Sequence, residues 1–249
     1  MHVHGLGVNP ADGALFIATH TGLYRTPEGR TTPERVGDSY QDTMGFTVAG
    51  PDYFLGSGHP DVKALQAGTP PLLGLIESRD GGGSWKPISL LGEADFHVLR
   101  FLGDRVYAYD ASNRRLLVSD DGGKSWRERK PPGELLDLAA DPVRPGHLLA
   151  ATARELFESA DDGRSWIRTG LAPGLLAWPA EHTLYLVDAA GAAYVSADAG
   201  RSWTPRGRIG GEPAALDAAG ERELYVALHD GTVKVSKDGG TAWAVRSTP

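Results

Sequence analysis

The 249-residue chain contains no cysteine and no long apolar run. Without thiols it cannot form a disulfide, a thiolate-ligated metal site, an iron–sulfur cluster or a cysteine nucleophile. No segment approaches the roughly 18 apolar residues that cross a bilayer, so we expect no transmembrane segment. Basic residues are a minority, 25 against 32 acidic ones, and the resulting charge of −7 opposes a nucleic-acid partner.

The beginning of the chain also lacks the positively charged and then apolar leader of an exported protein. A β-like segment from His2 to Val8 follows Met1 directly. We interpret this start as that of an exported protein whose leader is absent from the chain. The expected location is extracytoplasmic, in the periplasm, at the cell surface or outside the cell.

An eight-residue motif, Ser-x-Asp-x-Gly-x-Ser-Trp, occurs five times, with Ala242 replacing the second Ser in the last copy. The copies begin 37 to 41 residues apart, a period typical of an array of supersecondary units. Asp can accept backbone N–H bonds across a turn and Gly can adopt a positive φ, which predicts a structural role for the motif. The aspartates with this predicted role are Asp80, Asp121, Asp161, Asp198 and Asp238.

Each motif lies between short β-like segments, and four such segments per repeat of about 40 residues predict a β-propeller. A degenerate motif at Thr26 to Arg30 adds a sixth unit. We therefore expect an all-β, six-bladed propeller of four-stranded antiparallel blades, in one domain covering 1–249. A Gly- and Pro-containing insert, Gly58 to Pro71, is expected as a loop of the second blade. The expected blades are 1–38, 39–91, 92–131, 132–171, 172–209 and 210–249.

Histidines recur where this arrangement places strand starts and turns on one face of the propeller. Imidazoles together with carboxylates suit a divalent transition metal, here copper or zinc. The expected ligands are His4, His20, His59 and His97, with His2 and Met44 as further candidates. Two other interpretations stay open: a wet polar channel mouth that tolerates these residues, and a small-molecule or glycan site. The ligand-binding residues expected on this face are Asp61, Asp95, Asp110, Arg154, His229 and Asp230.

Several sequence phrases go beyond the repeated motif. They are His2-Val3-His4-Gly5-Leu6-Gly7-Val8-Asn9-Pro10, Ala18-Thr19-His20-Thr21-Gly22-Leu23, Gly56-Ser57-Gly58-His59-Pro60 and Asp95-Phe96-His97. With these phrases the whole chain resembles bacterial BNR/Asp-box repeat proteins, in particular a six-bladed group labelled "glycosylhydrolase". The resemblance implies a propeller of the sialidase and sortilin type, and the label implies glycoside hydrolysis.

The sialidase pattern itself is missing from this chain. It has no Arg-Ile-Pro phrase, and Arg154 is the one arginine that the arrangement places on the histidine-rich face, where a sialidase needs three. Another glycosidase would need two carboxyl groups about 5–5.5 or 6.5–9.5 Å apart. The candidates for that acid pair are Asp42, Asp95 and Glu134.

These observations predict a protein that binds a ligand, such as a divalent metal ion, at a face rich in His and Asp, without turnover. A glycoside hydrolase on the same fold is the main alternative, so the sequence leaves enzymatic activity open. A scaffold that docks protein partners on its blades is the other alternative.

Overall fold

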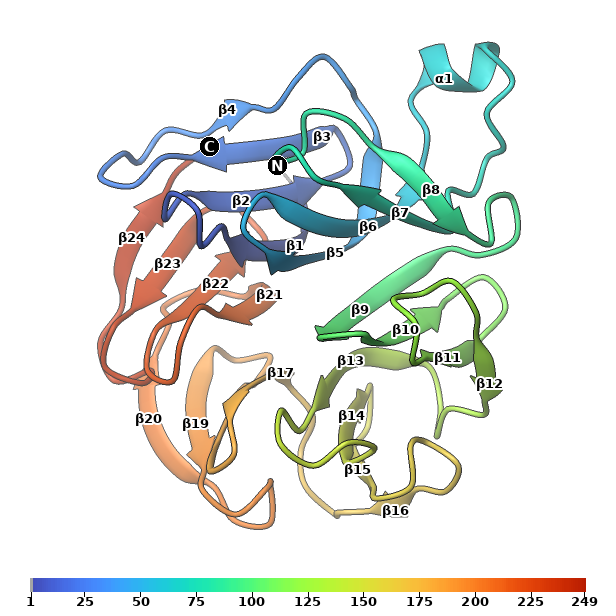
Figure 1. The fold of residues 1–249 in the computed structure, drawn as a ribbon. Helices are drawn as coiled ribbons and strands as arrows, with labels where there is room; N and C mark the ends of the chain where they lie inside the picture. Colours follow the sequence, from blue (N-terminus) through green and yellow to red (C-terminus); the bar gives the residue numbers. More distant parts are fainter. Residues whose placement is uncertain (1) are drawn as a thin grey trace. The chain divides into compact units, whose positions relative to one another are not determined.

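The computed structural model describes residues 2–249, which form six four-stranded sheets and one short helix (Figure 1). The four strands of each sheet follow one another in the chain, so each sheet corresponds to one repeat unit. The predicted all-β, six-bladed propeller with four-stranded antiparallel blades is confirmed. Within residues 2–249, no helix has the length and apolar character needed to cross a membrane.

The chain divides into two compact units, and each is described by itself. The first unit runs to Glu128 and also contains Ser247–Pro249, whereas the second is Arg129–Arg246. Apart from the last residue of the third sheet, Arg129, and the last residue of the sixth, Ser247, the first unit holds the first three sheets and the second unit holds the last three.

The first unit contains the only helix in the described part of the chain, α1 (Val62–Gln66), which stands in the insert of the second sheet (Figure 1). The second strand of each sheet is almost entirely buried, and most of these strands, such as β2, are largely apolar. The strands are β1 (Val3–Val8), β2 (Leu15–Thr19), β3 (Gly22–Thr26), β4 (Glu34–Arg35), β5 (Asp42–Gly50), β6 (Tyr53–His59), β7 (Leu75–Ser78), β8 (Lys86–Ser89), β9 (Phe96–Leu102), β10 (Arg105–Asp110), β11 (Arg115–Ser119) and β12 (Arg127–Arg129).

The second unit repeats this arrangement without an inserted helix. Its outer strands are mostly exposed, as in the two-residue strand β16 and in β20. The strands are β13 (Leu135–Ala140), β14 (Leu148–Thr152), β15 (Leu156–Ser159), β16 (Ile167–Arg168), β17 (Leu175–Ala180), β18 (Thr183–Val187), β19 (Ala192–Ser196), β20 (Thr204–Arg208), β21 (Pro213–Ala218), β22 (Leu224–Leu228), β23 (Val233–Ser236) and β24 (Ala244–Ser247).

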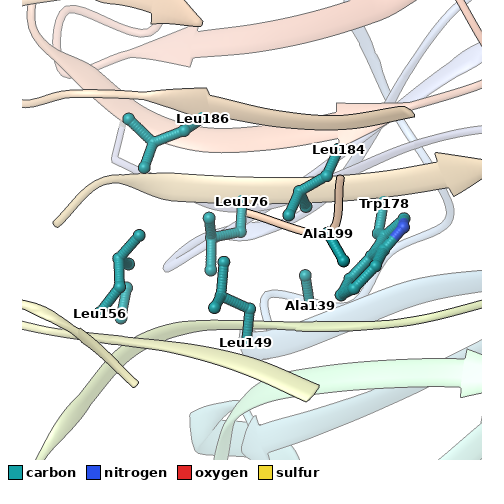
Figure 2. Close-up of a cluster of buried hydrophobic side chains, with 9 residues drawn as sticks. Ala139, Leu149, Leu156, Leu176, Trp178, Leu184, Leu186 and Ala199 are labelled. Carbon is teal, nitrogen blue, oxygen red and sulfur yellow. The ribbon is translucent and has the colours of Figure 1, made fainter. Parts of the chain in front are cut away.

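Apolar side chains from neighbouring sheets form the core within each unit. In the second unit, Leu149 of β14 and Leu184 of β18 contribute to one buried cluster together with Trp178 of β17 (Figure 2). In the first unit, the ring of Phe54 lies 4.6 Å from that of Phe16 and 5.5 Å from that of Phe46, measured between centroids. This packing holds the starts and ends of the strands, where polar side chains gather, in fixed positions.

The repeated motif forms the turn between the third and fourth strands of a blade. In the second sheet, Ser84 donates its backbone N–H to Asp80 Oδ1 at 2.9 Å and its hydroxyl to Asp80 Oδ2 at 2.6 Å. Ser78 donates its hydroxyl to Asp80 Oδ1 and accepts the N–H of Gly82, both at 2.8 Å. Gly82 has a φ of +87°, which explains the Gly at this position.

The fifth copy lacks one of these bonds because Ala242 has no hydroxyl. Asp238 still accepts the N–H of Ala242 at 2.9 Å and the hydroxyl of Ser236 at 2.8 Å. The missing hydroxyl also changes what lowers the pKa of the aspartate. The hydroxyl of the second Ser is the largest cause that lowers the pKa of Asp80 and of Asp198 to about 2, whereas the lowered pKa of Asp238 depends first on the backbone N–H.

Ala242→Ser is expected to stabilise the protein, because it supplies the hydroxyl bond that the other copies have. The melting temperature should rise by about 1–3 °C. Thermal unfolding followed by circular dichroism measures the change. The matched control, Ser202→Ala, removes the same bond from the Asp198 turn and should lower the melting temperature. An unchanged melting temperature in Ala242→Ser, with a drop in Ser202→Ala, would show that the fifth turn gains nothing from the bond.

Acid is expected to weaken the fold in a defined pH range. The pKa of Asp80, Asp161 and Asp198 is lowered to about 2 in the folded protein, below the usual 3.8, by hydrogen bonds to the carboxylates. The unfolded chain therefore takes up protons first as the pH falls, so this stabilisation is present above about pH 4 and is lost towards pH 2. Urea midpoints measured from pH 5 downward should fall in this window. A midpoint that stays constant down to pH 2 contradicts the role of the turns.

Candidate functional site

Each inner strand of the first unit carries one extra residue near its start. In β1, Val3 pairs with Thr19 and Gly5 pairs with Ala18, which leaves His4 between them without a partner in the register. Such a bulge turns a side chain away from the regular alternation of a strand. The same register shift occurs in β5 and β9, and the extra residues there are Met44 and His97.

The bulge in β1 places three imidazoles together. His2 and His4 are two residues apart, and His20 follows the end of β2, the strand paired with β1. The ring centroids lie 4.1 Å apart for His4 and His20, 4.7 Å for His2 and His4, and 5.0 Å for His2 and His20. One possible ligand atom from each of the three residues lies within 4.8 Å of those of the other two. We call His2, His4 and His20 the three-histidine cluster.

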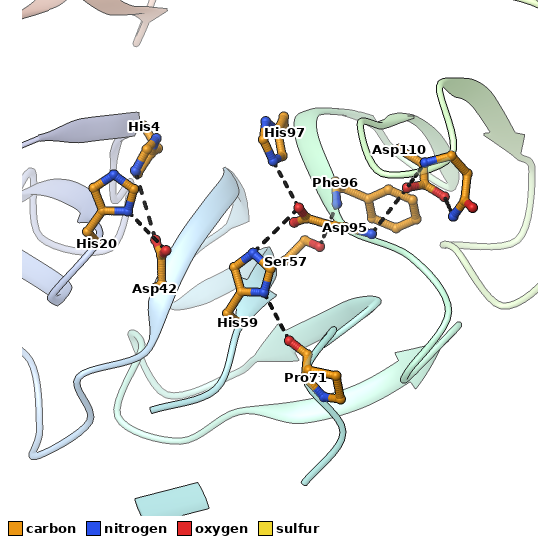
Figure 3. A network of polar contacts seen from close by, with 11 residues as sticks. His4, His20, Asp42, Ser57, His59, Pro71, Asp95, Phe96, His97 and Asp110 are labelled. Atoms are coloured by element: carbon orange, nitrogen blue, oxygen red, sulfur yellow. Dashed lines mark hydrogen bonds and ion pairs between the residues drawn. The ribbon is translucent and has the colours of Figure 1, made fainter. Parts of the chain in front are cut away.

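Asp42, at the start of β5, contacts this cluster (Figure 3). Its Oδ2 lies 2.9 Å from His20 Nδ1, and its Oδ1 lies 3.9 Å from His4 Nε2. Both His4 Nε2 and Asp42 Oδ1 are buried, and neither has a hydrogen-bond partner among residues 2–249. A buried polar atom without a partner costs free energy, so these two atoms mark a place where a further group would be stabilising.

Burial also determines the charge of His4. Desolvation is the largest cause that lowers the pKa of His4 to about 4, followed by the neighbouring imidazoles of His20 and His2. Asp42 acts in the opposite direction and raises this pKa, but by less. His4 is therefore neutral near pH 7, in the form whose nitrogen lone pair can bind a metal ion.

A second group of side chains surrounds Asp95, which immediately precedes β9 and is only 4% exposed. His97 Nε2 lies 2.9 Å from Asp95 Oδ2, and His59 Nε2 lies 3.5 Å from the same oxygen (Figure 3). His59 donates its Nδ1–H to the carbonyl of Pro71 at 3.0 Å. The hydrogen bond to Asp95 is the largest cause that raises the pKa of His97, so His97 carries a positive charge more readily than a free imidazole.

The predicted four-histidine site therefore divides into two groups. Figure 3 shows His4 and His20 beside Asp42, and His59 and His97 beside Asp95. His2 belongs to the first group through its contacts with the rings of His4 and His20. Two hydrogen bonds of 2.9 Å hold this division, one between His20 and Asp42 and one between His97 and Asp95. In the described chain, the set of residues close enough to share one ion contains His2 and excludes His59 and His97. Met44 is half-buried at its bulge.

Two further predicted ligand-binding residues make local structural contacts. Asp61 caps α1: its Oδ1 accepts the N–H of Ala64 at 2.8 Å, and its Oδ2 accepts from Ser39 and Tyr40. Asp110 is fully buried and pairs with Arg115 Nε at 2.9 Å. Its carboxylate also accepts bonds from Asn113 and from the backbone N–H of Asp95. Both carboxylates thus hold the neighbouring loops in place through hydrogen bonds.

The remaining candidates belong to the second unit. Glu134 and Arg154 are exposed there, as are His229 and Asp230. The N–H of His229 donates to the carbonyl of Glu212 at 3.1 Å, and Asp230 Oδ1 accepts the N–H of Thr232 at 2.8 Å. These bonds describe turns, and a binding role for these four residues stays a prediction.

His147 forms a buried cluster in the second unit that the sequence analysis did not identify. Its Nδ1 lies 3.0 Å from Asp141 Oδ2, and its Nε2 lies 2.8 Å from Glu158 Oε1. Both ring nitrogens are thus engaged by carboxylates within the second unit. No sequence motif predicts this cluster, because its members lie on different strands and turns.

Comparisons with known proteins agree with this architecture. A family model described as the BNR/Asp-box repeat matches residues 117–128. The dispase autolysis-inducing protein of Streptomyces mobaraensis is 27% identical over 93 residues, which are 37% of this chain and 25% of that protein. This chain is therefore similar to a small part of that protein.

Among solved structures, the nidogen/laminin complex is similar with a TM-score of 0.69 and 17% identity, over 95% of this chain and 93% of the matched one. The GH74 enzyme of Niastella koreensis is similar with a TM-score of 0.65 and 13% identity, over 98% of this chain and 45% of the enzyme. The chain thus spans less than half of that enzyme, and at these identities the likeness concerns the fold alone. The protein carries BNR/Asp-box repeats on a six-bladed β-propeller.

Proposed function

We propose that the protein binds one divalent transition-metal ion through the three-histidine cluster, without catalysing a reaction. The observation that carries this proposal is the approach of His2, His4 and His20 to within 4.8 Å of one another through possible ligand atoms. The buried Nε2 of His4, which has no hydrogen-bond partner among residues 2–249, adds support.

The donor set suits zinc or copper. Imidazole is a common ligand of both ions, and three protein ligands leave at least one position for water or another molecule. Two nitrogens bound to one tetrahedral zinc lie roughly 3.4 Å apart. A small rotation of the side chains, two of which are exposed, would bring the three nitrogens to that spacing. The neutral state of His4 removes the competition of a proton for its lone pair at neutral pH.

Asp42 has the role of an orienting carboxylate in this proposal. It holds His20 through Nδ1 at 2.9 Å, which turns the opposite nitrogen of the ring, Nε2, towards a ligand. Metal-binding histidines commonly donate their second ring N–H to a carboxylate in this way, which fixes the tautomer and the ring orientation. The half-buried position of Asp42 strengthens the bond relative to one in open water.

The contacts of the carboxylates favour metal binding over glycoside hydrolysis. Asp42 and Asp95 are two of the three candidates for the acid pair of a glycosidase. Each forms a hydrogen bond with an imidazole, Asp42 with His20 and Asp95 with His97. A glycosidase acid must reach the oxygen of the scissile bond. Asp95 is 4% exposed and has one of its oxygens occupied by His97, which supports a role in positioning imidazoles.

Metal binding is tested with untagged protein freed of metal by a chelator. Isothermal titration with Zn²⁺ and Cu²⁺ should give one ion per chain. His4→Ala and His20→Ala should each weaken binding by more than the roughly 10–100-fold that loss of an outer carboxylate costs. Cobalt substituted for zinc reports the coordination geometry through its visible absorption.

The controls separate the three-histidine cluster from other arrangements. His97→Ala and His59→Ala should leave the affinity for Zn²⁺ unchanged. The same is expected of His182→Ala, because the side chain of His182, in the second unit, is 77% exposed. Circular dichroism verifies that every variant is folded. Undiminished binding in the His4→Ala, His20→Ala double variant would falsify the proposal, and a requirement for His97 would restore the four-histidine site.

Asp42→Asn tests the orienting carboxylate separately. The amide keeps the size of the side chain but removes its charge, so the hydrogen bond to His20 becomes weaker. The affinity for Zn²⁺ should fall roughly 10–100-fold while the stoichiometry stays at one. Titration calorimetry measures both quantities. An affinity equal to that of the unaltered protein means that Asp42 does not orient His20.

A further inference from the structure

A cavity of about 440 Å³ lies in the first unit, between α1 and the outer part of the second sheet. We call it the Trp85 pocket, because Trp85 of the first intact repeat motif forms one of its walls. Volumes of this size hold small organic ligands. The insert from Gly58 to Pro71 was expected as a loop but contains α1 (Figure 1). Residues of this insert, among them Ala64 and Thr69, line the pocket together with Trp85.

Hydrogen bonds hold the walls of the pocket in place. Asp61 links α1 to the segment before β5 through Ala64 and Ser39. The backbone N–H of Leu73 donates to the carbonyl of Gly58 at 2.9 Å, which closes the base of the insert. The N–H of Gly92 donates to the carbonyl of Leu72 at 2.8 Å. The pocket is therefore largely formed before any ligand binds, which lowers the entropy cost of binding.

Trp85 presents an aromatic surface to open space. On one side its ring lies against the backbone of Gly56, where an added Cβ would come within 3.0 Å of it. The ring also lines a second, smaller cavity of about 30 Å³, which shares Ser39 and Gln41 with the Trp85 pocket. By contrast, Trp126 in the next sheet donates its indole N–H to Ser89 at 2.9 Å and packs near Phe96.

The other lining residues combine apolar surface with neutral hydrogen-bonding groups. Pro87 and Ile76 extend the apolar wall beside Trp85, while Gln41 and Thr69 contribute polar groups. The side-chain amide of Gln41 donates one hydrogen to the hydroxyl of Thr43 at 3.2 Å. Its amide oxygen and second amide hydrogen therefore stay available within the described chain. Asp61 is the one ionisable residue among those that line the cavity, and its carboxylate is engaged by α1.

We infer that the Trp85 pocket binds a neutral saccharide, a function beyond the proposed metal binding. The C–H face of a sugar ring carries partial positive charge, which complements the negative face of the indole of Trp85. Hydroxyls around the ring would bond to the amide of Gln41 and the hydroxyl of Thr69. The carboxylate of Asp61 is held ionised by its hydrogen bonds, which lower its pKa, and it disfavours an anionic sugar.

The test is a titration with short neutral oligosaccharides of glucose, xylose, mannose and N-acetylglucosamine, followed by calorimetry and tryptophan fluorescence. At least one series should bind at millimolar or lower concentration, and a galacturonic acid oligomer should not. Binding should persist in the presence of a chelator and in His4→Ala, which separates this pocket from the metal site. Trp85→Phe should weaken binding roughly tenfold.

A pair of substitutions on α1 locates the binding without disturbing the core. Ala64→Phe fills the pocket and should abolish saccharide binding. Val62→Phe adds the same side chain to the same helix at a position that is 69% exposed and outside the pocket, and should have no effect. No binding by any neutral series, binding that survives Ala64→Phe, or binding of a proline-rich peptide that no saccharide displaces would each overturn the inference.

Discussion

An unpaired residue near the start of an inner strand determines the chemistry of the first unit. The strand register leaves His4, Met44 and His97 as bulge residues of β1, β5 and β9. Because a bulge turns one side chain away from the regular alternation, it can present an imidazole at the end of a sheet whose interior is apolar. The buried strands behind it, such as β2, supply the rigidity that a binding site needs.

Two carboxylates then decide how the imidazoles are grouped. Asp42 draws His20 to 2.9 Å, and Asp95 draws His97 to the same distance. The consequences differ: His4, next to Asp42, is buried and neutral, whereas His97, next to Asp95, has a raised pKa. His4 therefore offers a nitrogen lone pair near pH 7, whereas His97 carries a positive charge more readily than a free imidazole. Neighbouring imidazoles on one unit can therefore have different roles.

The fold could be predicted from the sequence because the repeat determines both strand order and turn chemistry. The site could be predicted only in part. The sequence predicted His4 and His97 as ligands and Met44 as a further candidate, and all three are bulge residues in the structure. The ligand atoms of His59 and His97 are not among those that lie within 4.8 Å of one another around His4. Their contacts with Asp95 depend on distances between strands, which the repeat period does not determine.

The repeated motif and the sites are separate features of the same blades. Asp80 stabilises a turn through hydrogen bonds, and so do its counterparts in the other blades, so the motif says little about ligands. The proposed binding sites use instead what departs from the repeat: the imidazoles of the first sheet and the insert that carries α1. This division explains how chains with the same motif can differ in what they bind.

X-ray absorption at the zinc edge of the zinc-loaded, untagged protein tests the central claim most directly. The account predicts three imidazole nitrogens at roughly 2.0–2.1 Å from the ion, with oxygen from water completing the shell. A shell of four imidazoles, or one without imidazole scattering, would contradict it.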